Sequence, residues 1–345
     1  MFSDLHKVHN VHNPGSMKEW QKEISKFAHP VIRKSIGQMI NTIIPYFVLW
    51  GLMIYLVRHG FSFWILLPLI LAAAILLVRV FIIFHDCCHS SFFTSRRSNT
   101  VVGYITGILT FTPFELWRRS HIQHHATAGD LDRRGSGDIW TMTVEEYGMA
   151  SGLKRFAYRM VRNPFIMLGV GPVAMFLLLS RFPNKGANKD ERRSVLITNL
   201  ALLAIVLLAS WAIGFRTYLV IQLPVILIAG ALGIWLFYVQ HQYENVYWAR
   251  HEVWEPVRAA LEGSSYYRLP RILQWCTGNI GLHHIHHLRP RIPNYNLQPC
   301  YDTFPVLQSV RPLSIFGSLK SLWLNLWDEQ QKKMVSFRSL RQLAV

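Results

Sequence analysis

The chain has 345 residues, of which 51% are hydrophobic and 16% charged, and its formal net charge is +17. Uncharged stretches close to 20 residues long recur along it, which excludes an ordinary soluble domain and predicts a membrane protein. Membrane proteins concentrate Lys and Arg in cytoplasmic loops, and no basic and aromatic motif for nucleic acid is present, so we expect no nucleic-acid partner.

The first 38 residues precede any long apolar stretch, and we expect residues 1–38 to form a cytoplasmic segment. Helical periodicity places several apolar side chains of this segment on one stripe, with basic residues opposite. This pattern is typical of a helix that lies in the membrane interface and, equally, of a packed surface helix. The apolar positions are Trp20, Ile24, Phe27, Val31 and Ile32.

Four uncharged stretches are long enough to cross a bilayer. Residues 39–57 and 61–78 are separated by a three-residue turn, and residues 195–213 and 218–238 are also closely spaced. Each pair predicts a transmembrane hairpin. We therefore expect an all-α integral membrane protein with about four transmembrane helices in two hairpins.

Two weaker apolar stretches, residues 101–114 and 164–180, are shorter or broken by Gly and Pro. Each could be a span, a re-entrant segment or an interfacial helix. The loop 181–194 carries five Lys and Arg residues, which places it on the cytoplasmic side. With both weak stretches turning back, all histidine-rich segments reach the cytoplasmic side as a helical cap.

Histidine is unevenly distributed along the chain. There are 16 histidines, and three short segments, HDCCH, HIQHH and HHIHH, hold most of them. Imidazoles packed together cannot all ionise, and a metal ion satisfies them most simply. The clustered residues are His85, His89, His121, His124, His125, His283, His284, His286 and His287.

The spacing within these segments is that of one helix face, with histidines at i and i+4 or at i, i+3 and i+4. Eight histidines share this spacing, with His284 as the extra one. Eight ligands are too many for one ion and suit two ions with open positions. Imidazole suits iron, zinc, copper and nickel alike, so ligand type alone does not identify the metal.

Other metal chemistries fit less well. Cys87 and Cys88 could form a thiolate site, but the chain has only four cysteines and no CxxC pair, so we expect them to be small packing residues. A zinc hydrolase of the HExxH class lacks its motif, because HEVWE ends in Glu255. A metal transporter would need ligands inside the spans, whereas 195–213 and 218–238 carry no charged residue.

The segments HDCCHSSFF, HIQHHATAGDLDRRGSGDIWTMT and GNIGLHHIHHLRPRIPNYNL together resemble the membrane fatty acid desaturases, especially the acyl-lipid type of bacteria and plants. The resemblance covers roughly residues 40 to 310. It implies a non-haem di-iron enzyme that uses O₂ and two electrons to introduce a cis double bond into an acyl chain. A related hydroxylase or ketolase could share these segments and remains an alternative.

The resemblance also implies which residues bind the two iron ions. His241, in YVQHQYE, is an additional candidate because it follows the last span directly, and His284 is expected to pack nearby instead. Among the carboxylates beside the clusters, Asp86, Asp130, Asp132 and Asp138, we slightly favour Asp138 as a hydrogen-bond partner of a ligand. The predicted ligands are His85, His89, His121, His124, His125, His241, His283, His286 and His287.

No flavin or nicotinamide motif occurs, so electrons must come from an external donor, and a ferredoxin or flavodoxin with an acidic surface would suit the basic face. The other expected partners are membrane lipid acyl chains and O₂. We expect residues 39–310 to form the desaturase domain and 311–345 a cytoplasmic tail. The expected location is a bacterial cytoplasmic membrane, with the histidines facing the cytoplasm.

Overall fold

The computed structural model describes residues 20, 22–135 and 137–339. Within this part of the chain four helices are long and apolar enough to cross a membrane: α2 (Ile32–Arg58), α3 (Phe63–Cys88), α8 (Lys189–Ile213) and α9 (Phe215–His241). The expected helical fold with two hairpins is therefore confirmed, and the chain is a membrane protein. Each helix extends past its expected apolar run toward the end where the histidines lie, because length and hydropathy predict only the part inside the hydrocarbon.

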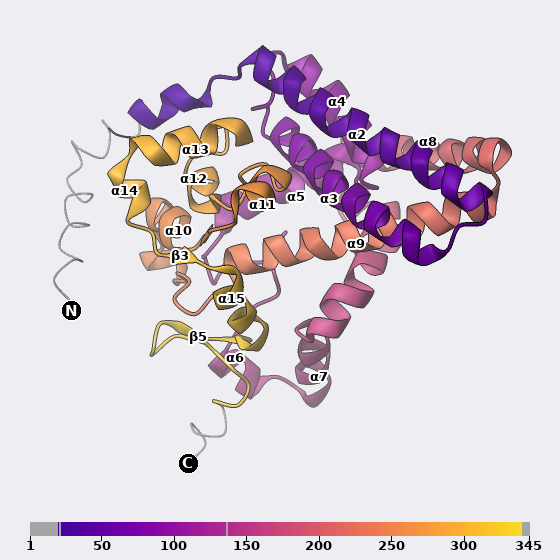
Figure 1. The fold of residues 1–345 in the computed structure, drawn as a ribbon. Helices are drawn as coiled ribbons and strands as arrows, with labels where there is room; N and C mark the ends of the chain where they lie inside the picture. Colours follow the sequence, from indigo (N-terminus) through magenta and orange to yellow (C-terminus); the bar gives the residue numbers. More distant parts are fainter. Residues whose placement is uncertain (1–19, 21, 136, 340–345) are drawn as a thin grey trace.

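The two hairpins lie side by side with their tight turns at the same end. The Nη2 group of Arg58, at the end of α2, donates a hydrogen bond of 3.0 Å to the carbonyl of Ala212, near the end of α8. In Figure 1 the connection between α2 and α3 lies at the right, and α10 to α14 gather at the left. The ends of α3 and α9 therefore point to the same side of the molecule, where the histidines lie.

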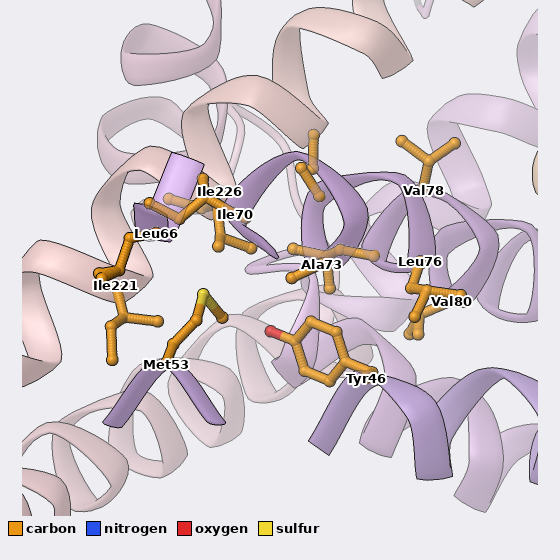
Figure 2. Close-up of a cluster of buried hydrophobic side chains, with 14 residues drawn as sticks. Tyr46, Met53, Leu66, Ile70, Ala73, Leu76, Val78, Val80, Ile221 and Ile226 are labelled. Atoms are coloured by element: carbon orange, nitrogen blue, oxygen red, sulfur yellow. The ribbon is translucent and has the colours of Figure 1, made fainter. Parts of the chain in front are cut away.

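Apolar side chains from three of these helices make one buried core. Tyr46 and Met53 of α2 meet Ile70 and Ala73 of α3 and Ile221 of α9 (Figure 2). Met53, Ile70, Ala73 and Ile221 are fully buried, so the contacting faces of α2, α3 and α9 are closed to lipid. Such close packing fixes how the helices sit against one another, and with them the side chains at their ends.

A short helical pair follows the first hairpin. Helix α4 (Arg96–Leu109) has 14 residues, about 21 Å at 1.5 Å per residue, which is too short to cross a bilayer of about 30 Å. The chain then reverses into α5 (Phe114–Thr127) through Phe111, whose φ is 59°, and the Thr112 amide donates to the Gly107 carbonyl at 2.7 Å. A Cβ on Gly107 would lie 2.5 Å from the Thr112 carbonyl oxygen, so this turn requires glycine.

The middle of the chain is less regular. It contains β1 (Met142–Thr143), α6 (Val144–Met149), α7 (Gly152–Val161), the π-helical η3 (Ile166–Val170) and η4 (Val173–Leu178), and the 3₁₀ segment η5 (Leu179–Arg181). The axis bends by 65° between Gly152–Val161 and Ile166–Arg181, so this pair is a broken span or a re-entrant loop. Both forms are among those expected for residues 164–180.

Short elements after α9 form a cap over the ends of α3 and α5. They are η6 (His251–Val253), α10 (Pro256–Glu262), β2 (Tyr266–Tyr267), α11 (Arg271–Cys276), α12 (His283–Leu288), α13 (Asn294–Thr303), α14 (Pro305–Gln308), β3 (Pro312–Leu313), α15 (Ile315–Ser318), η7 (Leu319–Trp323), β4 (Leu326–Asp328) and β5 (Lys333–Val335). Strand β4 lies between β1 and β5, parallel to β1 and antiparallel to β5, and β2 pairs with β3 in parallel.

The N-terminal stripe packs against this cap. Ile24, near the 3₁₀ segment η2 (Lys26–Ala28), is 1% exposed and contacts the apolar cluster that contains Leu282, Ile285 and Leu297. Val31 and Ile32 are exposed. The stripe therefore divides: its first part is a packed surface helix, and its last residues belong to the start of α2.

Candidate metal centre

The first pair of histidines lies where α3 ends. His85 is in the last turn and His89 is the C-terminal cap residue. Ser90 follows with a φ of 54°, and the Ser91 amide donates to the Asp86 carbonyl at 3.0 Å, which closes the helix end as in a Schellman motif. The helix therefore stops directly after the two imidazoles that it presents on one face.

The second group comes from α5. His121 and His124 are buried, and His125 is partly exposed. The ring of Trp117 stacks on the ring of His121 with centroids 4.2 Å apart. The same indole lies 5.8 Å from the ring of His85, so Trp117 packs against two of the clustered imidazoles.

The remaining histidines come from the short helix α12 and from the end of α9. His283, His286 and His287 are at most 9% exposed, and His241 is 6% exposed. The predicted candidate His241 therefore lies in the same buried region as the three histidine-rich segments.

The nine predicted ligands form two compact groups. Within each group the candidate ligand atoms all lie within 4.8 Å of one another, so each group could hold a metal ion. The first group, called cluster A, contains His85, His89, His121, His125 and His286; the second, cluster B, contains His124, His241, His283 and His287.

The Nε2 atoms converge within each cluster. In cluster A, His121 Nε2 lies 3.0 Å from His85 Nε2 and 3.1 Å from His125 Nε2. In cluster B, His241 Nε2 lies 3.1 Å from His124 Nε2 and 3.0 Å from His283 Nε2. Neighbouring nitrogens about one ion, at metal–nitrogen distances of about 2.0–2.1 Å, are about 3 Å apart.

One detail differs from the sequence expectation, which placed each HxxHH set on a single face. His121 and His125 belong to cluster A whereas His124 belongs to cluster B. In the third segment His283 and His287 belong to cluster B whereas His286 belongs to cluster A. Adjacent helical residues point about 100° apart, so HIQHH and HHIHH each contribute histidines to both clusters. The two histidines of each i, i+4 pair lie in the same cluster.

Several imidazoles are oriented through their second nitrogen. His124 Nδ1 lies 2.5 Å from Asp138 Oδ1, and His241 Nδ1 donates to the Gly263 carbonyl at 3.1 Å. His85 Nδ1 lies 3.3 Å from Asp86 Oδ1. Such partners leave Nε2 free to face the cluster and raise its basicity, as around bound metals in other proteins.

Burial in the clusters disfavours the charged form of several imidazoles. Burial lowers the pKa of the histidines on α5 and α12 well below its usual value, and repulsion from neighbouring imidazoles lowers it further; these residues are His121, His125, His283, His286 and His287. Neutral imidazole is the form that binds metal. These five residues therefore offer uncharged nitrogen donors held close together.

The donor set fits metal ions in two further respects. His89 Nε2 and His287 Nε2 are buried with no hydrogen-bond partner among the described residues, which is the state expected of nitrogens reserved for an ion. No cysteine or carboxylate of the described residues belongs to either cluster. Cys87 and Cys88 pack instead among Phe84 and Phe92, in line with the expectation that they fill space.

Three residues that lie near the histidine segments in the sequence belong to neither cluster. His284 lies in neither cluster; its Nε2 donates to the Leu307 carbonyl at 3.2 Å, and burial lowers its pKa to about 4. Asp130 bonds to His251 Nδ1 at 2.7 Å, and Asp132 bonds to Arg250 at 2.8 Å. These two carboxylates therefore join the cap to the loop after α5 and do not contact the clusters.

Sequence reasoning did not identify two of the groups that hold the ligands in place. The backbone amide and the side chain of Asn294 both donate to Asp86, and the carbonyl of Gly263 accepts from His241. A backbone carbonyl leaves no sequence signal, and Asn294 lies 208 residues from its partner. Only its position in the segment RPRIPNYNL, part of the family resemblance, could have identified Asn294.

Comparison with known proteins gives one consistent family. The family model described as "Fatty acid desaturase" matches residues 24–309. A "Fatty acid desaturase" of Bacillus subtilis (strain 168) is 47% identical over 328 residues, which are 95% of this chain and 93% of that protein. An "sn-1 oleoyl-lipid 12-desaturase" of Synechocystis is 28% identical over 72% of this chain and 66% of that protein. An "Omega-6 fatty acid desaturase, chloroplastic" of Arabidopsis thaliana is 26% identical over 70% of this chain and 53% of that protein.

Proposed function

The chain belongs to the fatty acid desaturase family, and we propose that it introduces a cis double bond into a lipid-linked acyl chain at a pair of iron ions. The enzyme is a fatty acid desaturase. The identity of the metal, the lipid-linked substrate and the electron donor are part of the proposal. The observation that supports them best is the division of nine histidines, most of them buried, into two adjacent clusters at the ends of membrane helices.

We assign one ion to each cluster. Cluster A offers five imidazoles and cluster B four, so an ion with six ligand positions keeps at least one position open for a further small ligand in each cluster. Desaturation is a redox reaction, so zinc, which has no redox chemistry, is not suitable although imidazole binds it well. When bound, the iron pair would activate O₂, the oxidant that removes two hydrogens from the acyl chain and is reduced to two water molecules with two electrons from the external donor and two protons.

The chain's own residues hold this pair and keep the substrate in place. Asp138, Asp86 and the Gly263 carbonyl orient the imidazoles, so that the donor set is formed before substrate arrives. The acyl chain has no charge to bind, so its position must be set by apolar contacts within the membrane part. The clusters lie at the ends of α3 and α9, where a bilayer-resident chain reaches them without crossing water.

A lipid-linked substrate is supported by similarity to an oleoyl-lipid desaturase. We place the clusters on the cytoplasmic side, because the loop between the bent pair and α8 carries five Lys and Arg residues. A cleft of about 230 Å³ reaches His125 and His287 from the side of α10, and Trp254 lines it. We assign this side to a ferredoxin or flavodoxin, whose acidic surface complements the basic chain.

Expression in a bacterial host that lacks desaturases and supplies reduced ferredoxin tests the function. Mass spectrometry of the lipid acyl chains should show a new double bond with the wild-type protein and none with His124→Ala. Hydroxylated chains in place of the double bond, or unsaturation that persists in His124→Ala, would overturn the proposal.

A further inference from the structure

A second cavity lies outside the histidine clusters, beside the end of the membrane helices. It has a volume of about 790 Å³ and is bounded by the first turns of α2, the middle of α3, and helices α11 and α13. This volume is within the range of about 300–1,000 Å³ that is typical of sites for small organic molecules. None of the nine clustered histidines lines it.

Arg79 of α3 is the most unusual residue of this cavity. Its side chain belongs to a membrane-spanning helix and is only 5% exposed, yet no carboxylate of the described residues lies within 4 Å of it. Its guanidinium donates to Thr42 Oγ1 at 3.0 Å and to the Trp275 carbonyl, and its Cζ lies 3.9 Å from the centroid of the Trp275 ring. A buried cation without a counter-ion is costly, which suggests that an anion completes the site.

Gln38 of α2 gives an independent indication in the same cavity. The residue is 5% exposed, and both its side-chain oxygen and its side-chain nitrogen are buried without a hydrogen-bond partner among the described residues. Buried amides nearly always have partners, and a pair of orphaned atoms in a cavity wall points to a polar ligand.

Two further cations, both exposed, line the cavity among neutral polar side chains. Lys34 and Arg271 join Arg79 at the cavity, and Arg271 has no ionic partner among the described residues. The single carboxylate in the lining, Asp302, already accepts a hydrogen bond of 2.8 Å from Gln298 Nε2. Three cations against one carboxylate favour an anionic ligand.

The cavity shares a wall with the metal centre. Asn294 lines it and also donates its backbone amide to Asp86 Oδ2 at 2.7 Å, while Oδ1 of Asp86 lies 3.3 Å from His85 Nδ1. Arg79 precedes His85 by six residues on the same helix, which is about 9 Å along its axis. A group bound here would therefore lie close to the reacting part of a chain that enters the clusters.

We propose that this cavity binds the phosphate-bearing headgroup of the lipid substrate, an inference that rests on the proposed function. The phosphoester contacts Arg79, Arg271 and Lys34, and the Gln38 amide bonds to the polar glycerol or ester groups. The headgroup thereby fixes how far the acyl chain extends toward the clusters. Inorganic phosphate carries the same anionic chemistry, so the test must separate the two sources.

The experiment uses the full-length protein in a neutral detergent and measures binding by isothermal titration calorimetry. The probes are dioctanoyl phosphatidylglycerol, dioctanoylglycerol and inorganic phosphate. The variants are Arg79→Gln, Arg271→Gln and Lys34→Gln, and the control is Arg97→Gln, which removes an exposed cation at the start of α4, outside the cavity. If Arg79→Gln fails to fold, the binding measurements with Arg271→Gln and Lys34→Gln test the proposal.

We expect phosphatidylglycerol to bind at least about tenfold more tightly than dioctanoylglycerol, because charge-assisted hydrogen bonds to phosphate are lost in the latter. Arg79→Gln and Arg271→Gln should each weaken its binding about tenfold, whereas Arg97→Gln should change it less than twofold. The proposal would be overturned if phosphatidylglycerol and dioctanoylglycerol bind equally, or if inorganic phosphate binds as tightly as phosphatidylglycerol. Unchanged affinity for phosphatidylglycerol in both Arg79→Gln and Arg271→Gln would also overturn it.

Iron content and desaturation are measured on the same preparations. These measurements distinguish a failure of the headgroup site from a failure of the proposed function. A wild-type protein that holds iron and desaturates but binds the two lipids equally would refute only the headgroup site. A protein that discriminates the lipids but neither holds iron nor desaturates would refute the proposed function and leave the anion site standing.

Discussion

Asn294 and Asp86, 208 residues apart, are joined by two hydrogen bonds: the backbone amide and the side-chain Nδ2 of Asn294 donate to Asp86 Oδ2 at 2.7 and 2.8 Å. Both residues are buried, at 2% and 1% exposed, and the other carboxylate oxygen of Asp86 faces His85. The pair therefore links the first histidine segment to the chain that follows the third.

Asp86→Asn should weaken metal binding in cluster A. The neutral amide loses the charge that supports His85, and loss of such a supporting partner typically costs about 10- to 100-fold in metal affinity. Iron retained after dialysis against a chelator, measured by plasma emission spectrometry, reports this loss. Ser91→Ala, which removes a hydroxyl that bonds only to the Asp86 backbone carbonyl, is the control and should retain wild-type iron.

Asp138→Asn should have the corresponding effect on cluster B, because Asp138 Oδ1 lies 2.5 Å from His124 Nδ1. We expect iron affinity to fall about 10- to 100-fold. The matched control is Asp132→Asn, since Asp132 lies in the same loop, pairs with Arg250 and belongs to neither cluster. Equal iron retention by both variants would show that Asp138 does not support a metal ligand.

His241→Ala and His284→Ala distinguish a ligand from a packed histidine. His241 belongs to cluster B, so its removal should release about one ion and leave cluster A loaded. His284 bonds to the Leu307 carbonyl instead, so its replacement should lower thermal stability and leave the metal content unchanged. Mass spectrometry of the intact protein under native conditions counts the ions; two ions in His241→Ala would exclude His241 as a ligand.

Gly107→Ala should destabilise the turn between α4 and α5. A Cβ there would lie 2.5 Å from the backbone oxygen of Thr112, and relieving that overlap typically costs about 1–3 kcal/mol. Gly51→Ala is the control, because a Cβ at Gly51 meets nothing within 4 Å. Thermal unfolding should show a lower midpoint for Gly107→Ala alone, and equal midpoints would contradict the close approach.

The sequence was sufficient for the four spans, and the nine histidines that it singled out lie together in the folded chain. Uncharged runs identified α2, α3, α8 and α9, because the bilayer requires length and apolarity that can be read locally. The i, i+4 spacing correctly paired His121 with His125 and His283 with His287. These features depend only on helix geometry, which the local sequence determines.

The division of the histidines between two clusters could not be read in this way. It depends on how α5 and α12 rotate against α3 and α9, and that rotation is set by packing between residues far apart in sequence. His241 shows the same limit, because only the folded chain brings it within 3.0 Å of His283. The carbonyl of Gly263 and the side chain of Asn294 likewise act through contacts that tertiary structure alone creates.

The central claim is that clusters A and B each hold one iron ion. Mössbauer spectroscopy of protein grown on ⁵⁷Fe, combined with the iron-to-protein ratio, tests it most directly. We predict about two iron ions per chain with signals of nitrogen-ligated, magnetically coupled iron, and about one uncoupled ion per chain in His241→Ala. A wild-type protein that binds a single ion, or an iron content and spectrum that are unchanged in His241→Ala, would contradict the claim.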